Sequence, residues 1–494
     1  MRRLVHRFTV ARSSRNALRI AVLAVLAVLA VSLAIACGQE VMIPDPVTGA
    51  PDGAAADGGT DGATTPDASS QDGGVDAADV VCPVVAPDDA VGVYVSPGSV
   101  NGATCGTLAA PCKTLAFGIT RAGAVGRTKV YASRGVYVEQ LTLVAGIELV
   151  GGWDVTSATA WRRACVSPED AVVIRAPNNK SITVQAIDLG GEARLSLVRI
   201  ESKPQGQVDG AESLYGVVAL GATTTLVMND VRVEMGNAGP GVNGLKGDAG
   251  VDGGPSCPAG PGGAGIAGTQ GPGAPAGTFA DDGYEPGAAS PGASAAAGGD
   301  GTVGGTGTCV PCGACGLPPL CAWTADGTES CGKNGASGCG GGPGAPGGPA
   351  IGGGSNIGVY VFSATVTING GKIKSGDGGN GGTGAAGGAG GAATRGTAGT
   401  NGDLCVTSCT AGAIACTEVK TRGIGGAAGG AGGAGGVGGP GGGGGGGSSF
   451  ATYANAPGLV TTTASTTLAH GKAGTGGGPD AGAGAKGIAA DHVP

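Results

Sequence analysis

Histidine, aromatic side chains and charge are all scarce in this sequence, and each scarcity narrows what the chain can do. Aromatic residues make up 3% of the 494 residues, and much of the 41% hydrophobic content is alanine within glycine-rich tracts. The core that can be packed is therefore modest. Of the three histidines, only His470 and His492 lie beyond the N-terminal segment. The sequence therefore has almost no histidine from which a Ser/His/Asp or Cys/His catalytic arrangement could be built.

Glycine is abundant instead, with 109 residues and no sustained Gly-X-Y frame. This composition indicates a modest folded part plus low-complexity segments. The net charge of −8 becomes about −14 once the six arginines of residues 1–36 are removed. A chain this acidic, without a basic stripe, is a poor candidate for binding nucleic acid or an anionic lipid surface, so no nucleic-acid partner is expected.

The N-terminus has the order of an export signal. Six arginines precede the uncharged run IAVLAVLAVLAVSLAIA, residues 20–36, which is followed by Cys37. A cysteine directly after LAIA resembles the lipobox of bacterial lipoproteins, which implies cleavage before Cys37 and attachment of diacylglycerol to its thiol. One departure is Ala34, three positions before the cysteine, where that motif usually has leucine. An ordinary secretory signal and an uncleaved anchor are the alternatives, although 17 residues is short for a span.

Residues 38–81 repeat Asp, Gly, Ala, Pro and Thr, as in PDGAAADGGTDGATTPDASSQDGG. Such a segment cannot bury enough apolar surface to fold, and its like charges repel one another. We expect a disordered tether between the lipidated Cys37 and the folded part.

The first folded sequence reads as short β-branched runs separated by glycine, with one helix. A strand is predicted over residues 93–95, and further strands at KVYAS, VYVEQ, LTLV and IELVGG. Thr114 is a candidate N-cap for a short helix. Its apolar side would carry Leu115, Ala116, Ile119 and Ala122.

The order YVSP…GT…PCKTL…AG…KVYASRGVYVE…LVGGW, over roughly residues 93–163, resembles the N-terminal segment of right-handed parallel β-helix proteins of the DUF1565 type. Trp161-Arg162-Arg163 after GGWD is similar to the secreted lipoprotein versions that carry glycine-rich, PGRS-like inserts. The resemblance implies an all-β fold, a right-handed parallel β-helix whose open end is covered by the short helix. Such a cover would protect an otherwise unpaired strand edge.

An internal repeat supports a stacked architecture independently. Residues 213–236, 355–376 and 448–471 are similar, and residues 193–202 form a weaker upstream copy. The aligned pairs are Ser213 with Ser355, Gly216 with Gly358, Val217 with Val359, Asn229 with Asn369, Val233 with Ile373, Gly236 with Gly376, Tyr360 with Tyr453, and Ile373 with Leu468. Each copy alternates apolar and polar residues, so it can bury one face only against its neighbours. Asn229 and Asn369 form either an amide ladder or a pair of turns.

The copies are separated by very unequal glycine-rich lengths, which therefore resemble inserts at one corresponding point of the repeat. The predicted organisation is as follows: residues 1–36 signal peptide, 37–81 lipidated cysteine and tether, 82–236 N-terminal part of the β-helix, 237–354 Gly/Cys-rich insert, 355–376 rung, 377–447 Gly-rich insert, 448–471 rung, and 472–494 Gly/Ala-rich tail. Glycine recurs every third residue at 378–390 and 423–447, the period of a polyproline-II-like chain. Because ordering glycine is entropically costly, mobile loops are favoured over packed polyglycine ribs.

Fourteen cysteines remain besides Cys37, an even number, and outside the cytoplasm disulfides are expected. The candidates are Cys82, Cys105, Cys112, Cys165, Cys257, Cys309, Cys312, Cys315, Cys321, Cys331, Cys339, Cys405, Cys409 and Cys416. Cys105 with Cys112 is a plausible pair, which leaves Cys82 with Cys165; the other pairings cannot be read from spacing. CVPCGACGLPPLC also resembles the start of an iron–sulfur run, but Cys321 follows after five residues rather than three. Disulfides are favoured over metal, and no cofactor is expected.

Two acidic–basic pairs on strands, Asp230 with Arg232 and Asp154 with Arg162, are the candidates for polysaccharide cleavage, a frequent activity of β-helices in other families. Charged strand positions mostly face water, so we expect solvated residues and no catalytic site. The calcium-binding nonapeptide of β-roll repeats is also absent from the sequence.

The sequence thus predicts an exported protein, lipid-anchored at the outer membrane or cell surface, with a periplasmic-facing location as the alternative. Its expected role is non-catalytic, in adhesion, matrix or envelope structure, with surface glycans or other envelope proteins as candidate partners. A carbohydrate-active lyase or hydrolase and a Cys-cluster metal or redox protein are the alternatives.

Overall fold

The computed structural model describes residues 86–157, 160–165, 167–255, 257–318, 320–412, 415–478 and 482–494, all within one compact unit. Cys37, the tether and Cys82 lie outside the described residues. Strands dominate this part of the chain; the helices are α2 (Leu115–Ala124), α3 (Pro168–Ala171) and the 3-10 turn η1 (Gln205–Gln207). None of these helices is long and apolar enough to cross a membrane.

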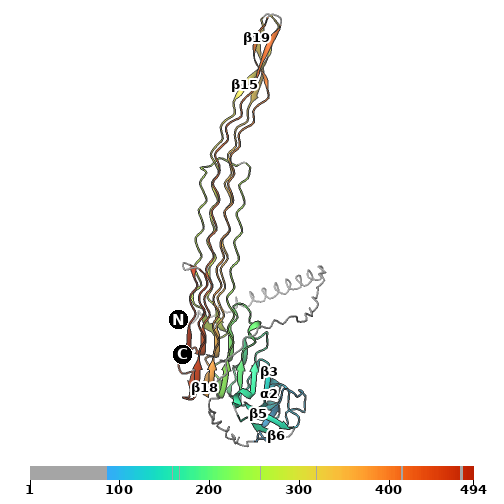
Figure 1. The fold of residues 1–494 in the computed structure, drawn as a ribbon, viewed down its shortest axis with the longest axis vertical. Coiled ribbons are helices and arrows are strands. Elements are labelled where there is room, and N and C mark those ends of the chain that lie inside the picture. The colour runs from blue at the N-terminus through green and yellow to red at the C-terminus, as the bar shows by residue number, and fades with distance from the viewer. Residues whose placement is uncertain are drawn as a thin grey trace, which may run out of the picture. The chain divides into compact units, whose positions relative to one another are not determined.

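The first of two large sheets has twelve strands (Figure 1). Its order is β1 (Gly92–Val95), β2 (Lys129–Ser133), β5 (Glu148–Ser157), β9 (Gly191–Ser196), β12 (Thr224–Glu234), β10 (Arg199–Glu201), β7 (Val172–Arg175) and β3 (Gly135–Val138), with β18 (Thr365–Lys374) on β12, β22 (Val460–Thr462) and β23 (Thr467–Ala469) on β18, and β6 (Ala160–Arg163) on β5. Every pairing is parallel except that of β5 with β6.

The second sheet is parallel and six-stranded, in the order β24 (Ala489–Val493), β21 (Ser449–Ala454), β17 (Asn356–Phe362), β11 (Leu214–Leu220), β8 (Ile182–Ile187) and β4 (Leu141–Thr142). Apolar residues from both sheets form one buried cluster, including Val217 of β11 and Leu226 of β12. The prediction of residues 472–494 as a tail is wrong at its end, because β24 pairs with β21. We call the two sheets and their connections the base.

The three repeat copies are layered on one another in the predicted register. In the second sheet Val217 pairs with Val359, and Tyr360 pairs with Tyr453. In the first sheet Asn229 pairs with Asn369, and Ile373 with Leu468. The alternation of apolar and polar residues predicts this register, because shifting one strand by one residue would turn its apolar side chains toward water.

The paired asparagines form the amide ladder rather than separate turns. Asn369 Nδ2 donates to Asn229 Oδ1 at 3.0 Å, and Asn229 Nδ2 donates to Ser196 Oγ at 3.2 Å. Each half-buried amide thus finds its partner in the next layer, which fixes the register as well as satisfying the polar atoms.

Helix α2 begins as predicted. Thr114 is its N-cap and accepts from Phe117 N–H. The Glu139 carboxylate accepts from Leu115 N–H at 2.8 Å and so forms a second cap, which was not predicted from the sequence. Ala116 is exposed, so its assignment to the apolar side is wrong. Gly118 takes that place, since a Cβ there would press on Val95 of β1. The helix therefore packs closely on the edge strand of the first sheet.

The outer face of the second sheet carries an aromatic cluster that a hairpin of the first insert covers. β13 (Thr278–Ala280) and β14 (Gly283–Glu285) form this hairpin. Phe279 stacks on Tyr453 with ring centroids 4.4 Å apart, and Tyr453 stacks on Tyr360 at 5.2 Å. The insert is thereby fastened to the base through side chains as well as through its ends.

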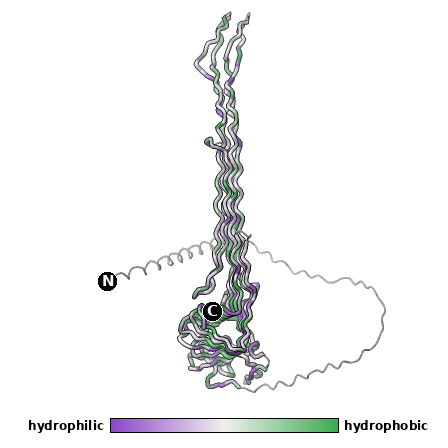
Figure 2. Tube along the Cα trace, turned by 90° about the vertical axis from the view of Figure 1, so that its left-hand side faces the viewer, coloured by the Kyte–Doolittle hydropathy of each residue, from purple (hydrophilic) through white to green (hydrophobic). Residues whose placement is uncertain are grey.

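The glycine-rich inserts form ordered chains that run side by side (Figures 1 and 2). We call residues 237–255, 257–277, 286–308, 332–354, 377–404, 422–447, 471–478 and 482–488 the glycine bundle. Its chains are joined by backbone hydrogen bonds at every third residue; for example, the N–H groups of Gly241, Gly244 and Gly247 donate to the carbonyls of residues 380, 383 and 386. A threefold repeat in extended chains that form no strand ladder is the pattern of polyproline II.

This order overturns the preference for mobile loops. An isolated glycine chain would lose too much entropy, but here each chain is bonded to several others and the entropic cost is met collectively. Gly382 N–H, for example, donates to Ile351, and its own carbonyl accepts from Gly444. The inserts also keep the register of the base at first: Asn229 and Asn369 are 140 residues apart, and so are the hydrogen-bonded Asp252 and Ala392 in the bundle.

Candidate functional site

In each of the two acidic–basic pairs named as catalytic candidates, one member is engaged by another partner. Asp154 and Arg162 are opposite one another on β5 and β6, but Asp154 pairs with Arg134 and Arg162 is exposed. Asp230 lies at a corner with φ of 49°, and it forms no ion pair with Arg232. Neither pair forms a two-group site for cleaving a glycosidic bond.

Arg232 belongs instead to a charge ladder across the first sheet. Its guanidinium contacts Asp170 at 3.0 Å and Glu234 at 2.6 Å, and Arg199 contacts Glu234 at 2.6 Å. Burial alone would raise the pKa of Glu234, but the Arg232 hydrogen bond and the positive charges of both arginines outweigh it and lower that pKa. The Glu234 hydrogen bond raises the pKa of Arg232. The ladder therefore holds groups of opposite charge that pair with one another, not a group poised to exchange protons. Its pairing is incomplete, because Asp170 Oδ1, Arg199 Nε and Arg232 Nε are buried without a hydrogen bond among the described residues.

The two histidines have separate partners. His492 Nδ1 is 2.8 Å from the hydroxyl of Thr452, and His470 Nε2 is 3.9 Å from Asp491. Thr452 is fully buried and so is inaccessible to a substrate. Among the described residues the histidines thus complete no relay of nucleophile, base and acid.

All thirteen described cysteines are in disulfides. The printed pairs are Cys105–Cys112, Cys257–Cys339, Cys309–Cys331, Cys312–Cys405, Cys315–Cys409 and Cys321–Cys416. The first confirms a predicted pair; Cys165 is also bonded, while Cys82 lies outside the described residues, so that pairing stays a prediction. The iron–sulfur-like cysteines each have their own partner, which leaves no thiolate among them for a metal. So many disulfides indicate an oxidising, extracellular environment.

Three of these disulfides staple two hairpins at the far end of the bundle, which we call the tip. β15 (Cys309–Cys315) pairs with β16 (Trp323–Cys331), and β19 (Cys405–Ala411) pairs with β20 (Cys416–Thr421). The stapled cysteines are 93, 94 and 95 residues apart. The first spacing equals that of Asn356 and Ser449, paired on β17 and β21, and the other two exceed it by one and two residues, so the layers of the base continue in register to Cys312–Cys405.

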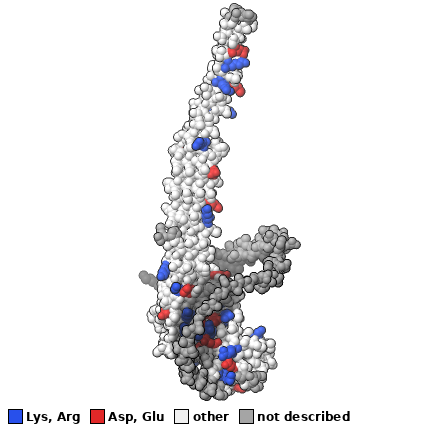
Figure 3. Space-filling view, viewed as in Figure 1, with Lys and Arg blue, Asp and Glu red and all other residues white. Residues whose placement is uncertain are grey.

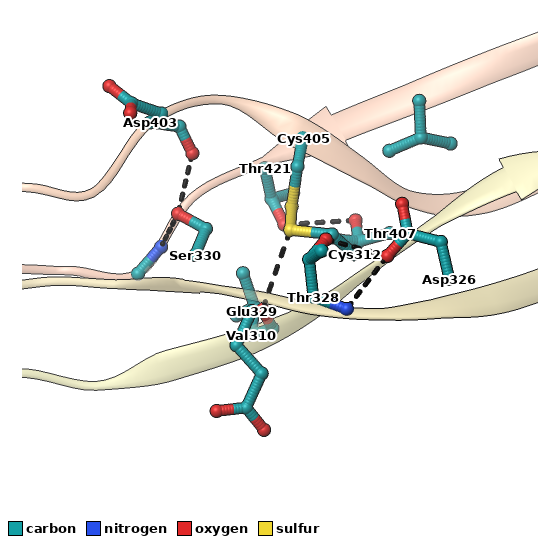
Figure 4. Close-up of a disulfide and its surroundings, with 12 residues drawn as sticks. Val310, Cys312, Asp326, Thr328, Glu329, Ser330, Asp403, Cys405, Thr407 and Thr421 are labelled. Carbon is teal, nitrogen blue, oxygen red and sulfur yellow. Dashed lines mark hydrogen bonds between the residues drawn. A yellow bond between two sulfur atoms is a disulfide. The ribbon is translucent and has the colours of Figure 1, made fainter.

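Hydrogen bonds between the hairpins reinforce the staples (Figure 4). The Ser330 hydroxyl donates to the carbonyl of Asp403 at 2.5 Å, and Trp323 Nε1 donates to the carbonyl of Val406 at 3.1 Å. Because polar side chains gather here, the tip offers more recognition chemistry than the chains that lead to it. Leu317 and Leu320, in the loop after β15, are 86% and 84% exposed.

The amount of glycine along each chain follows the number of chains packed around it. In residues 237–255, at the edge, about one residue in three is glycine, and the residues between are exposed except Ala238. Residues 442–447 are all glycine and exchange backbone hydrogen bonds with six other chains of the bundle. A Cβ at Gly441 would overlap the carbonyl oxygen of Gly348, and one at Gly444 that of Ile351. Glycine is required there because backbones touch directly on every side.

The same chain shows what happens where a neighbour ends. Gly443 and Gly446 donate to the carbonyls of residues 482 and 485, in the C-terminal hairpin whose arms are residues 471–478 and 482–488. Beyond that hairpin, Val437, Ala434 and Ala431 occupy the corresponding third positions and are exposed. The run of seven glycines at 441–447 thus corresponds to the part of the chain that is enclosed by neighbouring chains.

The outward side chains of the bundle are mostly small and uncharged. Figure 3 shows charged residues gathered over the base and scattered more sparsely along the bundle face in view. Several outward polar groups serve the bundle itself: Asn237, Asn243 and Asp252 accept from backbone N–H groups of the neighbouring chain. The sequence reasoning missed these groups; their signal is Asn or Asp at the non-glycine positions of a three-residue period.

No family model, no curated protein and no solved structure matches this chain. The architecture and the tip therefore have to be interpreted from their own chemistry.

Proposed function

We propose that this chain is a lipid-anchored, non-catalytic surface protein whose base is a right-handed parallel β-helix and whose glycine bundle is a stalk that presents the tip. The parallel layers of the base, in the register of the repeats, support the β-helix, as does the resemblance of residues 93–163 to the DUF1565 type. Cys37 after its apolar run supports the lipid anchor, and the acidic tether would separate the base from the outer membrane.

One observation carries the proposal. The spacing of 93 residues between Asn356 and Ser449 in the base recurs at Cys312–Cys405 in the tip, while enclosed glycine positions exclude side chains entirely. If the inserts served only as flexible spacers, neither the recurring spacing nor glycine at the enclosed positions would be required. At about 3.1 Å per residue, residues 422–447 extend over roughly 80 Å, a reach suited to holding an adhesive or structural contact away from the membrane.

The test combines lipid labelling with accessibility on intact cells. Labelled palmitate should enter the wild-type protein and be lost in Cys37→Ala, which should also release the chain from the membrane fraction. An epitope inserted between β19 and β20 should be stained on unpermeabilised cells.

A matched epitope in the exposed loop at residues 98–102 of the base reports whether the base is equally accessible. An unlabelled wild-type chain would contradict the lipid anchor. A tip epitope stained only after permeabilisation would contradict surface presentation. Robust turnover of acidic polysaccharides by the purified chain would contradict the non-catalytic role.

A further inference from the structure

A polar cleft lies where the hairpin β13–β14 meets the edge of the second sheet. It has a volume of about 420 Å³ and is lined by Gln140, Asn179, Lys180, Tyr215, Asp282 and Tyr284, among others. These residues come from the β3–β4 connection, the loop before β8, strand β11 and the hairpin. The cleft therefore exists only because the first insert folds back on the base. Its size is in the range of sites for small ligands.

Three side chains in this cleft have no partner within the described part of the chain. The Asn179 amide, the Lys180 ammonium and the Asp282 carboxylate are exposed and make no hydrogen bond or ion pair. Some other charges of the base are paired, as Arg175 is with Glu201. The cleft thus brings together a donor, an acceptor and an amide that are all available.

A buried ion pair holds one wall of the cleft in place. Lys203 is 2% exposed, and its Nζ contacts Glu212 at 2.6 Å and donates to the carbonyl of Asn178 at 3.0 Å. Burying a lysine is costly unless every proton is satisfied, so a carbonyl fixed by such a group is held firmly. The neighbouring Asn179 and Lys180 are thereby carried on an anchored loop.

The opposite wall is held through a tyrosine. Tyr284 N–H donates to the Tyr215 hydroxyl at 2.8 Å, which ties the hairpin to β11. Tyr284 itself is half-buried, so part of its surface remains in the cleft. Asp282 stands in the same hairpin, directly before the Gly283 that turns the chain with φ of 120°.

We infer that this cleft binds a neutral, polyhydroxylated ligand the size of a sugar residue. Asp282 would repel an anionic ligand and Lys180 a cationic one, whereas a hydroxyl both donates to a carboxylate and accepts from an ammonium. Asn179 offers both functions, and Tyr284 offers apolar surface to the C–H face of a sugar ring. This inference concerns the base, so it stands independently of the lipid anchor and of the stalk.

The test is calorimetric titration of the purified chain with a panel of neutral mono- and disaccharides and the matching uronic acids. Neutral sugars should bind, and Asp282→Ala and Lys180→Ala should each weaken binding roughly tenfold or more, since each removes a hydrogen bond to a charged group. Asp281→Ala is the control, because Asp281 is an equally exposed neighbour that does not line the cleft.

Thermal unfolding of each variant should be unchanged, because all three side chains are exposed. The inference is overturned if no neutral sugar binds, if uronic acids bind in preference, or if Asp281→Ala weakens binding as much as Asp282→Ala.

Discussion

A single methyl group placed inside the glycine bundle should be strongly destabilising. In Gly441→Ala the added carbon would overlap the carbonyl oxygen of Gly348 and lie 2.6 Å from the Gly348 carbonyl carbon, well inside normal contact. Both contacts are with backbone, which cannot move aside by a change of rotamer. The chains must separate, and the hydrogen bond from Gly441 N–H to Ala385, 2.8 Å long, would stretch or break.

The magnitude follows from two contributions. Overpacking costs about 1–3 kcal/mol, and each weakened backbone hydrogen bond about 1 kcal/mol. Alanine also reduces the conformational entropy of the unfolded chain. This effect stabilises the fold by less than about 1 kcal/mol and so offsets only part of the cost. We expect a net loss of roughly 3 kcal/mol in local stability. Amide hydrogen exchange in residues 435–447 should therefore accelerate by about a hundredfold.

The matched control is Gly263→Ala in a neighbouring chain of the bundle. A Cβ at Gly263 would meet no atom within 4 Å. The same substitution should be neutral or slightly stabilising there, because only the unfolded-state effect remains. Equal exchange rates for both variants and the wild type would refute the idea that direct backbone contact requires glycine at 441.

Three further predictions concern the tip, the base and pH. Replacing Cys312 and Cys405 together by serine should destabilise the tip by about 2–4 kcal/mol, seen as faster hydrogen exchange in the hairpins with an unchanged base; an unaltered tip would show that the staple is dispensable. Asn369→Ala should lower the unfolding free energy of the base by about 1 kcal/mol in urea titrations, because its ladder partner loses a hydrogen bond, and a neutral effect would argue against the ladder. Because the pKa of Glu234 is lowered in the folded state, its ionised form stabilises the fold at pH values above about 4.3, the ordinary glutamate pKa. This stabilisation is lost as the pH falls through the lowered folded-state pKa. An NMR titration should place this pKa below that of a free glutamate and higher again in Arg232→Gln; a wild-type pKa at or above the ordinary value would contradict the pairing.

Much of the base can be predicted from the sequence because its determinants are local or repeated. Alternating apolar residues in the repeats fix which face is buried, and equivalent positions such as Asn229 and Asn369 then fix the layers. Thr114 identifies the helix start because an N-cap acts within one turn. Ala116 was misplaced because residue type alone does not say that a glycine, Gly118, packs tighter against a strand.

The bundle could not be predicted in the same way, although its period was visible. Whether a glycine chain orders depends on how many other chains surround it, and those lie up to 211 residues away along the sequence, as Ala274 and Ala485 do. The disulfide partners of the tip follow from the same long-range register, so spacing within one insert does not reveal them. Once the register of the base is known, Cys312 with Cys405 follows directly from it.

The most direct test of the account is the backbone order of the glycine-rich inserts in solution. Amide order parameters from NMR relaxation, measured with labelled glycine, should be about 0.85 for Gly382, Gly388 and Gly444, equal to those of the base strands. Values below about 0.6 for these three glycines would mean that the inserts are mobile chains, and the stalk would have no structural basis.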